Sequence, residues 1–107
     1  MGFYEKRYDL KHIVIRDTGE AVEADGGTLH IYKGSGRQRW EAKLSAVKND
    51  KIFEDSILEE KGYINFKFGS NENVEIEGTA FVSDFDPSSG GSNIILTGVG
   101  RVIEYRG

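Results

Sequence analysis

The last third of the chain contains two extended apolar segments separated by a short turn-forming run. The segments VEIEGTAFVSDFD and NIILTGVGRVIEY are joined by PSSGG. In the first segment apolar residues recur at even spacing, which is the period of a strand with one packed face; they are Val74, Ile76, Ala80 and Val82. The pattern predicts a pair of strands in a β-rich scaffold and contains no sign of a catalytic centre.

The length of the chain limits it to one domain. With 107 residues, it can bury roughly two-thirds of the surface that the unfolded chain exposes. The absence of cysteine excludes a disulfide framework, a thiolate nucleophile and a zinc ribbon. No segment approaches the roughly 20 apolar residues of a membrane span, and the N-terminus has no apolar run of signal-peptide length. We expect a single β-rich domain over residues 1–107, soluble and intracellular, without membrane contact.

Composition favours strands over helices. Fourteen glycines stand against one proline, and they occur at apparent turns, which suits several short strands better than a helical bundle. The formal charge of −4 arises from 18 acidic and 14 basic residues that interleave along the chain, which argues against strong nonspecific nucleic-acid binding. The expected fold is mainly β: a β-sandwich or small barrel of about seven strands with one flanking α-helix.

Several strands are predicted in the first half of the chain. They cover residues 10–15, 21–24, 28–33 and 39–47. A tight turn is predicted at Asp25, Gly26 and Gly27, because Asp-Gly and Gly-Gly supply the positive backbone angles that hairpin turns require. In the last of these strands small and apolar residues alternate with polar ones, so we expect the single tryptophan on the packed face; the alternating residues are Trp40, Ala42, Leu44 and Ala46.

The second half begins with the one helix that the sequence predicts. This helix covers residues 50–60, with Asp50 as its N-terminal cap and Gly62 as its terminator. Residues 64–68 then alternate between apolar and polar. They are expected to form a hairpin with the strand that begins at Val74.

Two aspartates and two histidines are the candidate side chains for catalysis or metal binding. Asp84 and Asp86 flank Phe85 and point the same way on an extended chain, as a hard metal ion or an acid/base pair requires. An ordinary solvated turn has the same composition and is the preferred interpretation. His12 and His30 lie in predicted strands without a neighbouring ligand motif, so we expect them to be surface or partly packed residues. No catalytic residue, cofactor site or metal ligand is predicted, and we do not expect an enzyme.

A basic cluster is the best candidate for nucleic-acid binding, because it combines cations with one aromatic ring; its members are Lys33, Arg37, Arg39, Trp40 and Lys43. If the ring of Trp40 is packed in the core, the stacking argument disappears. Two Gly-x-Gly-Arg runs, at Gly34 and Gly98, could approach a phosphate through backbone amides. Neither is a Walker loop, so turn glycines are the preferred interpretation.

The run from residue 75 to residue 102 resembles the corresponding part of the major tail tube proteins of long-tailed phages. The shared features are a strand carrying Glu-Gly, a small residue followed by aromatic, valine and serine positions, a polar turn, and a strand ending in Thr-Gly-x-Gly. In this chain they are Glu77-Gly78, Ala80-Phe81-Val82-Ser83, the turn over residues 86–92, and Thr97-Gly98-Val99-Gly100. The predicted order of helix and then strand over residues 50–68 is compatible with the same family.

The resemblance implies a virion structural protein: a tail tube subunit, or a smaller tail or head-tail joining subunit. Such a subunit forms a homo-hexameric ring, and the rings stack with other phage tail proteins around a DNA conduit. Its strand edges pair between subunits. An acidic lumen lets DNA slide through without sequence-specific binding. The implied location is the virion, and the host cytoplasm during assembly.

Under this hypothesis the assembly contacts fall in two polar segments that glycines punctuate, residues 17–27 and 34–39. The candidate residues for a lumen or an interface are Asp17, Glu20, Glu23, Asp25, Arg37 and Arg39. For Glu20, Glu23 and Asp25 a solvated face fits equally well.

Two other classes of function stay open. A small acidic inhibitor or adaptor, encoded by a phage and binding a host protein, would also be compact and free of cysteine, and it would remain monomeric or dimeric. A carboxylate-based enzyme would use Asp84 and Asp86 and would bind a divalent metal. We rank the structural assembly protein first, the binding module second and the enzyme last.

Overall fold

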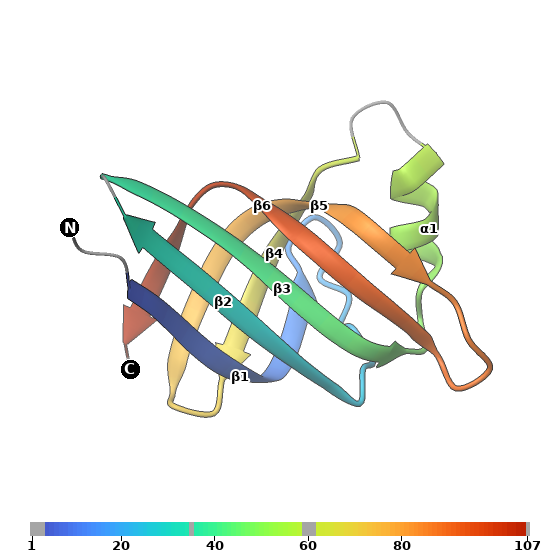
Figure 1. Ribbon diagram of the computed structural model, residues 1–107. Coiled ribbons are helices and arrows are strands. Elements are labelled where there is room, and N and C mark those ends of the chain that lie inside the picture. Colours follow the sequence, from blue (N-terminus) through green and yellow to red (C-terminus); the bar gives the residue numbers. More distant parts are fainter. Residues whose placement is uncertain (1–3, 35, 59–61, 107) are drawn as a thin grey trace.

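The computed structural model describes residues 4–34, 36–58 and 62–106, and in these ranges the chain forms a closed antiparallel barrel with one short helix (Figure 1). The order of strands around the barrel is β1-β2-β3-β6-β5-β4. Within the described ranges, no helix has the length and apolar character that crossing a membrane requires. The elements are β1 (Tyr4–Ile15), β2 (Gly26–Gly34), β3 (Arg37–Val47), α1 (Lys51–Leu58), β4 (Ile64–Ser70), β5 (Val74–Asp86) and β6 (Ser92–Arg106).

The first strand closes the barrel by joining two ladders. The N-terminal half of β1 pairs with β2, with Tyr8 opposite Leu29. The C-terminal half pairs with β4, with Ile13 opposite Phe68, after a register shift between Leu10 and His12. Because such a shift bends a strand and increases its twist, one continuous strand can leave one neighbour and join another.

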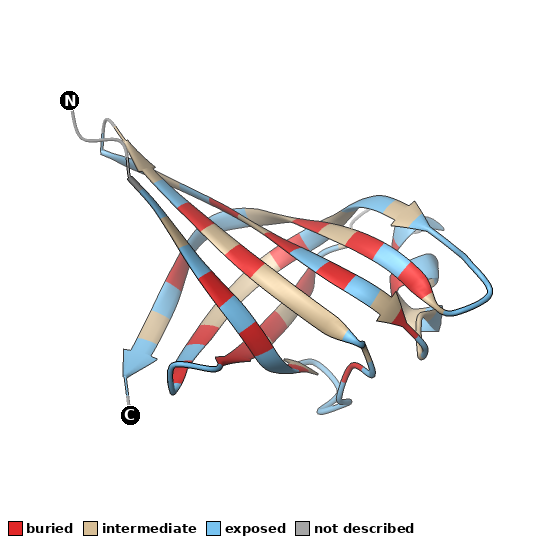
Figure 2. Ribbon diagram, turned by 60° about the horizontal axis from the view of Figure 1, so that its bottom comes forward, coloured by how far each residue is buried: buried red, intermediate tan, exposed pale blue. Residues whose placement is uncertain are grey.

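The interior of the barrel is a packed core. Buried and exposed residues alternate along the strands, as expected when one face of each strand points inward (Figure 2). Phe66 stacks on Phe68 at 5.3 Å between ring centroids, and Trp40 meets Phe68 edge-on at 5.8 Å. Trp40 is 2% exposed, which confirms its predicted place on the packed face. Apolar side chains therefore fill the barrel in the described ranges.

The helix α1 packs beside the end of β5 (Figure 1). Its Phe53 is fully buried and stacks on Phe66 at 6.1 Å. Asp50 precedes the first helical residue as predicted, and its main-chain carbonyl accepts hydrogen bonds from the Phe53 and Glu54 N–H groups. Its carboxylate accepts a hydrogen bond from the Ser92 hydroxyl, which ties the start of the helix to the start of β6. The predicted helix end at residues 59–60 lies outside the described residues.

The fold class is confirmed, but the strand count is six in the described ranges instead of about seven. The predicted strand over residues 21–24 makes a single bridge, between Val14 and Ala21. The predicted turn at Asp25, Gly26 and Gly27 is also wrong, since both glycines begin β2 and pair with β3. A Cβ at Gly27 would lie 3.3 Å from the Leu44 side chain, so this glycine provides space in the core and does not form a turn.

The alternation of buried residues in β3 ends at Leu44 and does not extend to Ala46 as predicted. Ala46 has a positive φ of 52°, and the register with β6 shifts between Leu44 and Val47. The shift places Val47, and not Ala46, in the core. The segment 34–39 is also less loop-like than predicted, because Gly34 ends β2 and Arg37 begins β3.

Candidate functional site: a groove between β3 and β6

The strands β3 and β6 are neighbours over only part of their length. Their pairing begins at Val47 opposite Ser92 and, among the described residues, extends no further than Glu41 opposite Thr97. Beyond that point β6 bends away from β3 and continues along β5 as far as Arg106 opposite Val74 (Figure 1). Gly100 lies in this bend with a φ of 77°, a conformation that favours glycine.

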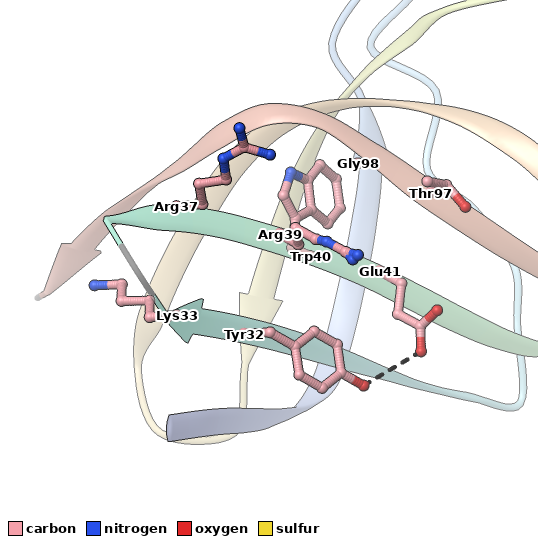
Figure 3. A pocket seen from close by; sticks show the side chains of 9 residues that line it. Tyr32, Lys33, Arg37, Arg39, Trp40, Glu41, Thr97 and Gly98 are labelled. Carbon is pink, nitrogen blue, oxygen red and sulfur yellow. Dashed lines mark hydrogen bonds between the residues drawn. The ribbon is translucent and has the colours of Figure 1, made fainter. Parts of the chain in front are cut away.

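The separation of the two strands leaves a groove, here called the β3–β6 groove. It has a volume of about 900 Å³ and lies beside the tip of the β2–β3 hairpin (Figure 3). It is lined by Tyr32, Lys33, Gly34, Arg37, Arg39, Trp40, Glu41, Thr97 and Gly98. The sequence predicts a cluster of these cations with Trp40, but it gives no local signal that Tyr32, Glu41 and Thr97 lie beside them.

The indole of Trp40 lies between the two strands against two glycines. A Cβ atom at Gly98 would lie 2.2 Å from the indole, and one at Gly78 would lie 2.6 Å from it. These glycines therefore make room for the ring. The indole Nε1 is buried and has no hydrogen-bond partner among the described residues. Because Trp40 is buried, it does not offer the exposed stacking ring on which the nucleic-acid hypothesis depended.

Two arginines give the groove its charge. Arg37 and Arg39 are exposed and two residues apart on β3, so they lie on the same side of the strand, about 7 Å apart. Among the described residues, neither guanidinium forms an ion pair. Lys33 adds an ammonium group at the end of β2 (Figure 3). The groove thus favours acidic groups.

Tyr32 and Glu41 form the polar wall of the groove. The Tyr32 hydroxyl donates a hydrogen bond of 3.4 Å to the Glu41 carboxylate (Figure 3). Desolvation, and then the negative charges of Glu41 and Glu5, raise the pKa of Tyr32 above its ordinary value of 10.0. The phenol therefore stays neutral at physiological pH and remains a hydrogen-bond donor.

The four predicted acidic contact residues lie away from this groove, because the loop that contains them precedes β2 and the groove lies at the end of β2. Asp17 accepts hydrogen bonds from the backbone N–H and the side-chain Nδ2 of Asn65, at 3.1 and 2.9 Å, and these bonds lower the pKa of Asp17. Glu20 accepts a hydrogen bond of 3.0 Å from Asn49.

The rest of this loop is held mainly through its backbone. The Glu23 N–H donates to the Asn49 side-chain oxygen, and the Asp25 N–H donates to the Ser45 carbonyl. The six predicted contact residues therefore fall into two separate groups, the acidic loop and the arginines of the groove.

The remaining candidate side chains do not form a cluster. Asp84 and Asp86 are exposed at the end of β5, on either side of the half-buried Phe85. His30 contacts the Glu5 carboxylate at 2.7 Å, and His12 lies against Gly69 on the strand pair β1–β4. In the part of the chain that the structure describes, no group of three histidine or acidic side chains could hold a metal ion.

A second surface lies on the outer face of β5 and β6. Its large apolar residues are 37–55% exposed, and this surface, here called the outer stripe, consists of Phe81, Val99, Ile103 and Tyr105. Tyr63 extends it by meeting Phe81 edge-on at 6.4 Å. The sequence does not predict the stripe, because Gly98 and Gly100 give a turn signal at the place where the alternation of β6 changes.

Comparison of the chain with protein-family models, with curated protein sequences and with solved structures finds no match.

Proposed function

We propose that this protein is a self-associating structural subunit of a phage virion, in the tail tube or at a tail or head-tail junction. The observation that carries the proposal is the outer stripe. Exposed apolar side chains gathered on one face of a sheet are typical of protein–protein contacts. In this chain the stripe lies on β5 and β6, the same segments that resemble tail tube proteins.

In the proposed assembly, subunits form a homo-hexameric ring around a DNA conduit and stack with other phage tail proteins. The packed interior of each barrel is consistent with a conduit between subunits. The net charge of −4 is consistent with a lumen that repels the DNA backbone and binds no particular sequence. The protein would act in the virion after assembly in the host cytoplasm.

The assembly state of the purified chain tests the proposal. Light scattering across concentrations should give a mass near six times 11.9 kDa, and negative-stain microscopy of the same sample should show rings or tubes. Replacing Ile103 and Tyr105 together by glutamate should shift the mass toward the monomer, because charges would be buried in the contact. Ile57→Glu with Leu58→Glu is the matched control, because it changes the net charge by the same amount on two exposed residues of α1, outside the stripe.

A second candidate function is a small acidic inhibitor or adaptor that binds a host protein. The β3–β6 groove favours it, because a cationic groove of this size can hold a segment of one partner. A wild-type chain that remains monomeric at every concentration would contradict the assembly proposal and favour the adaptor.

A further inference from the structure

We propose that the β3–β6 groove of one subunit binds the acidic end of β5, residues 83–86, of a second copy of the chain. This inference rests on the proposed function of self-association. The contact that it adds is separate from the outer stripe.

The groove offers an open strand edge. Residues 37–40 of β3 pair with β2 on one side and, within the described ranges, have no strand partner on the side of β6. On the facing strand, the Val102 N–H donates to the side chain of Gln38 at 2.9 Å, so a side chain stands where a neighbouring strand would supply a carbonyl. Such an edge can pair with an extended segment of another chain.

The positive charges of the groove favour binding of an acidic segment. Arg37 and Arg39 follow the two-residue period of the strand and have no carboxylate partner among the described residues. An extended segment with acidic residues at the same period can place one carboxylate opposite each guanidinium. Arginine–carboxylate pairs are strong because each hydrogen bond is charge-assisted.

The end of β5 has the matching pattern. Asp84 and Asp86 are exposed, are two residues apart, and form no ion pair among the described residues. The β4–β5 ladder ends at Ala80, so the end of β5 has a strand neighbour only on the side of β6 in the described structure. Several other acidic groups are already engaged within their own subunit: Asp17 with Asn65, Glu20 with Asn49 and Asp55 with Lys51.

The two surfaces lie at opposite ends of the barrel. The tip of the β2–β3 hairpin is at one end, and the end of β5 is at the other, beside α1 (Figure 1). A contact between them joins two different surfaces, so each subunit can bind one neighbour at each end. Head-to-tail contacts of this kind close into a ring or extend into a filament.

Charge reversal with rescue tests the pairing. One variant combines Arg37→Glu with Arg39→Glu, and a second combines Asp84→Lys with Asp86→Lys. Each alone should raise the apparent Kd of self-association by about tenfold or more. An equimolar mixture of the two, or a single chain with all four substitutions, should restore association, because opposite charges again face each other. Lys11→Glu with Lys48→Glu is the control for the first variant, since it changes the net charge by the same amount on exposed residues elsewhere.

Analytical ultracentrifugation of each sample measures the association, and far-UV circular dichroism checks that each variant folds. If a reversal variant unfolds, Arg37→Gln with Arg39→Gln and Asp84→Asn with Asp86→Asn replace it and should weaken association in the same direction. If both reversal variants assemble like the wild type, the inference is overturned while the proposed function stands. Loss of assembly without rescue overturns the pairing and assigns the groove to another segment. A wild-type chain that never assembles overturns both proposals.

Discussion

The two ends of the barrel use their charged residues in different ways. At the end beside α1, Asp17 is hydrogen-bonded to Asn65, Glu20 to Asn49 and Asp50 to Ser92. At the end with the β3–β6 groove, Arg37 and Arg39 have no acidic partner in the described part of the chain. The first group helps to hold the loops of the fold in place, whereas the arginines are available for contacts with another molecule. We therefore expect substitutions of these hydrogen-bonded residues to change stability, and substitutions of the groove arginines to change binding.

The largest effect on stability is expected from Phe53→Ala, which leaves a cavity between α1 and the core. Phe53 is fully buried and stacks on Phe66, so the free energy of unfolding should fall by about 3–5 kcal/mol in urea denaturation. The control Leu58→Ala removes a side chain that is 81% exposed on the same helix and should have little effect. A loss below about 1 kcal/mol for Phe53→Ala would show that α1 is not part of the cooperative core.

A smaller loss in the free energy of unfolding is expected from Gly98→Ala, at the floor of the groove. The new Cβ would lie 2.2 Å from the indole of Trp40, so the ring or β6 must move, at a cost of about 1–3 kcal/mol. The fluorescence of Trp40, the single tryptophan, should change together with the stability. Gly90→Ala is the matched control, because nothing lies within 4 Å of the new Cβ there. Equal effects of the two substitutions would contradict the close contact.

Asp17→Ala should cost about 1 kcal/mol or less, because the group is exposed and its hydrogen bonds from Asn65 are partly screened. The effect should depend on pH. The folded-state pKa of Asp17 lies below its ordinary value of 3.8, so this contribution is fully present above that value. It is lost as the pH falls through the folded-state pKa. Wild type and variant, compared by thermal unfolding along an acid titration, should therefore converge at low pH.

The smallest change in stability is expected from Arg37→Gln combined with Arg39→Gln. Both side chains are exposed, so the free energy of unfolding should change by less than about 0.5 kcal/mol in urea denaturation. Self-association should weaken in the same variant. A large loss of stability would show that the arginines support the fold, and the contrast between the two ends would then be wrong.

The hairpins of the second half were predictable because their signals are local. Residues 64–68 alternate between apolar and polar, the strand from Val74 begins with apolar residues at even spacing, and the structure pairs the two with Phe68 opposite Ile76. The burial of Trp40 was also predictable, because Trp40, Ala42 and Leu44 are spaced two residues apart and therefore lie on the same, packed face of the strand.

The closure of the barrel and the groove could not be predicted, since both depend on segments far apart in the chain. Gly27 gives the same local signal whether it forms a turn or makes room for Leu44. Arg37 and Arg39 were singled out as cations, but their surroundings depend on where β6 leaves β3. No local pattern gives that point of departure, which lies where Gly98 approaches Trp40 and just before the bend at Gly100.

Because β1 pairs with both β2 and β4, its two ladders form at different stages of folding. Synthesis produces β1 first, yet its C-terminal half pairs with β4, whose residues emerge after β2, β3 and α1. The ladder with β2 can form early, whereas the ladder with β4 must close a loop of about 50 residues, which is slow in proteins dominated by non-local strand pairs. Barrel closure is thus a late step, and a nascent chain that stops before β4 retains one unpaired strand edge on the C-terminal half of β1.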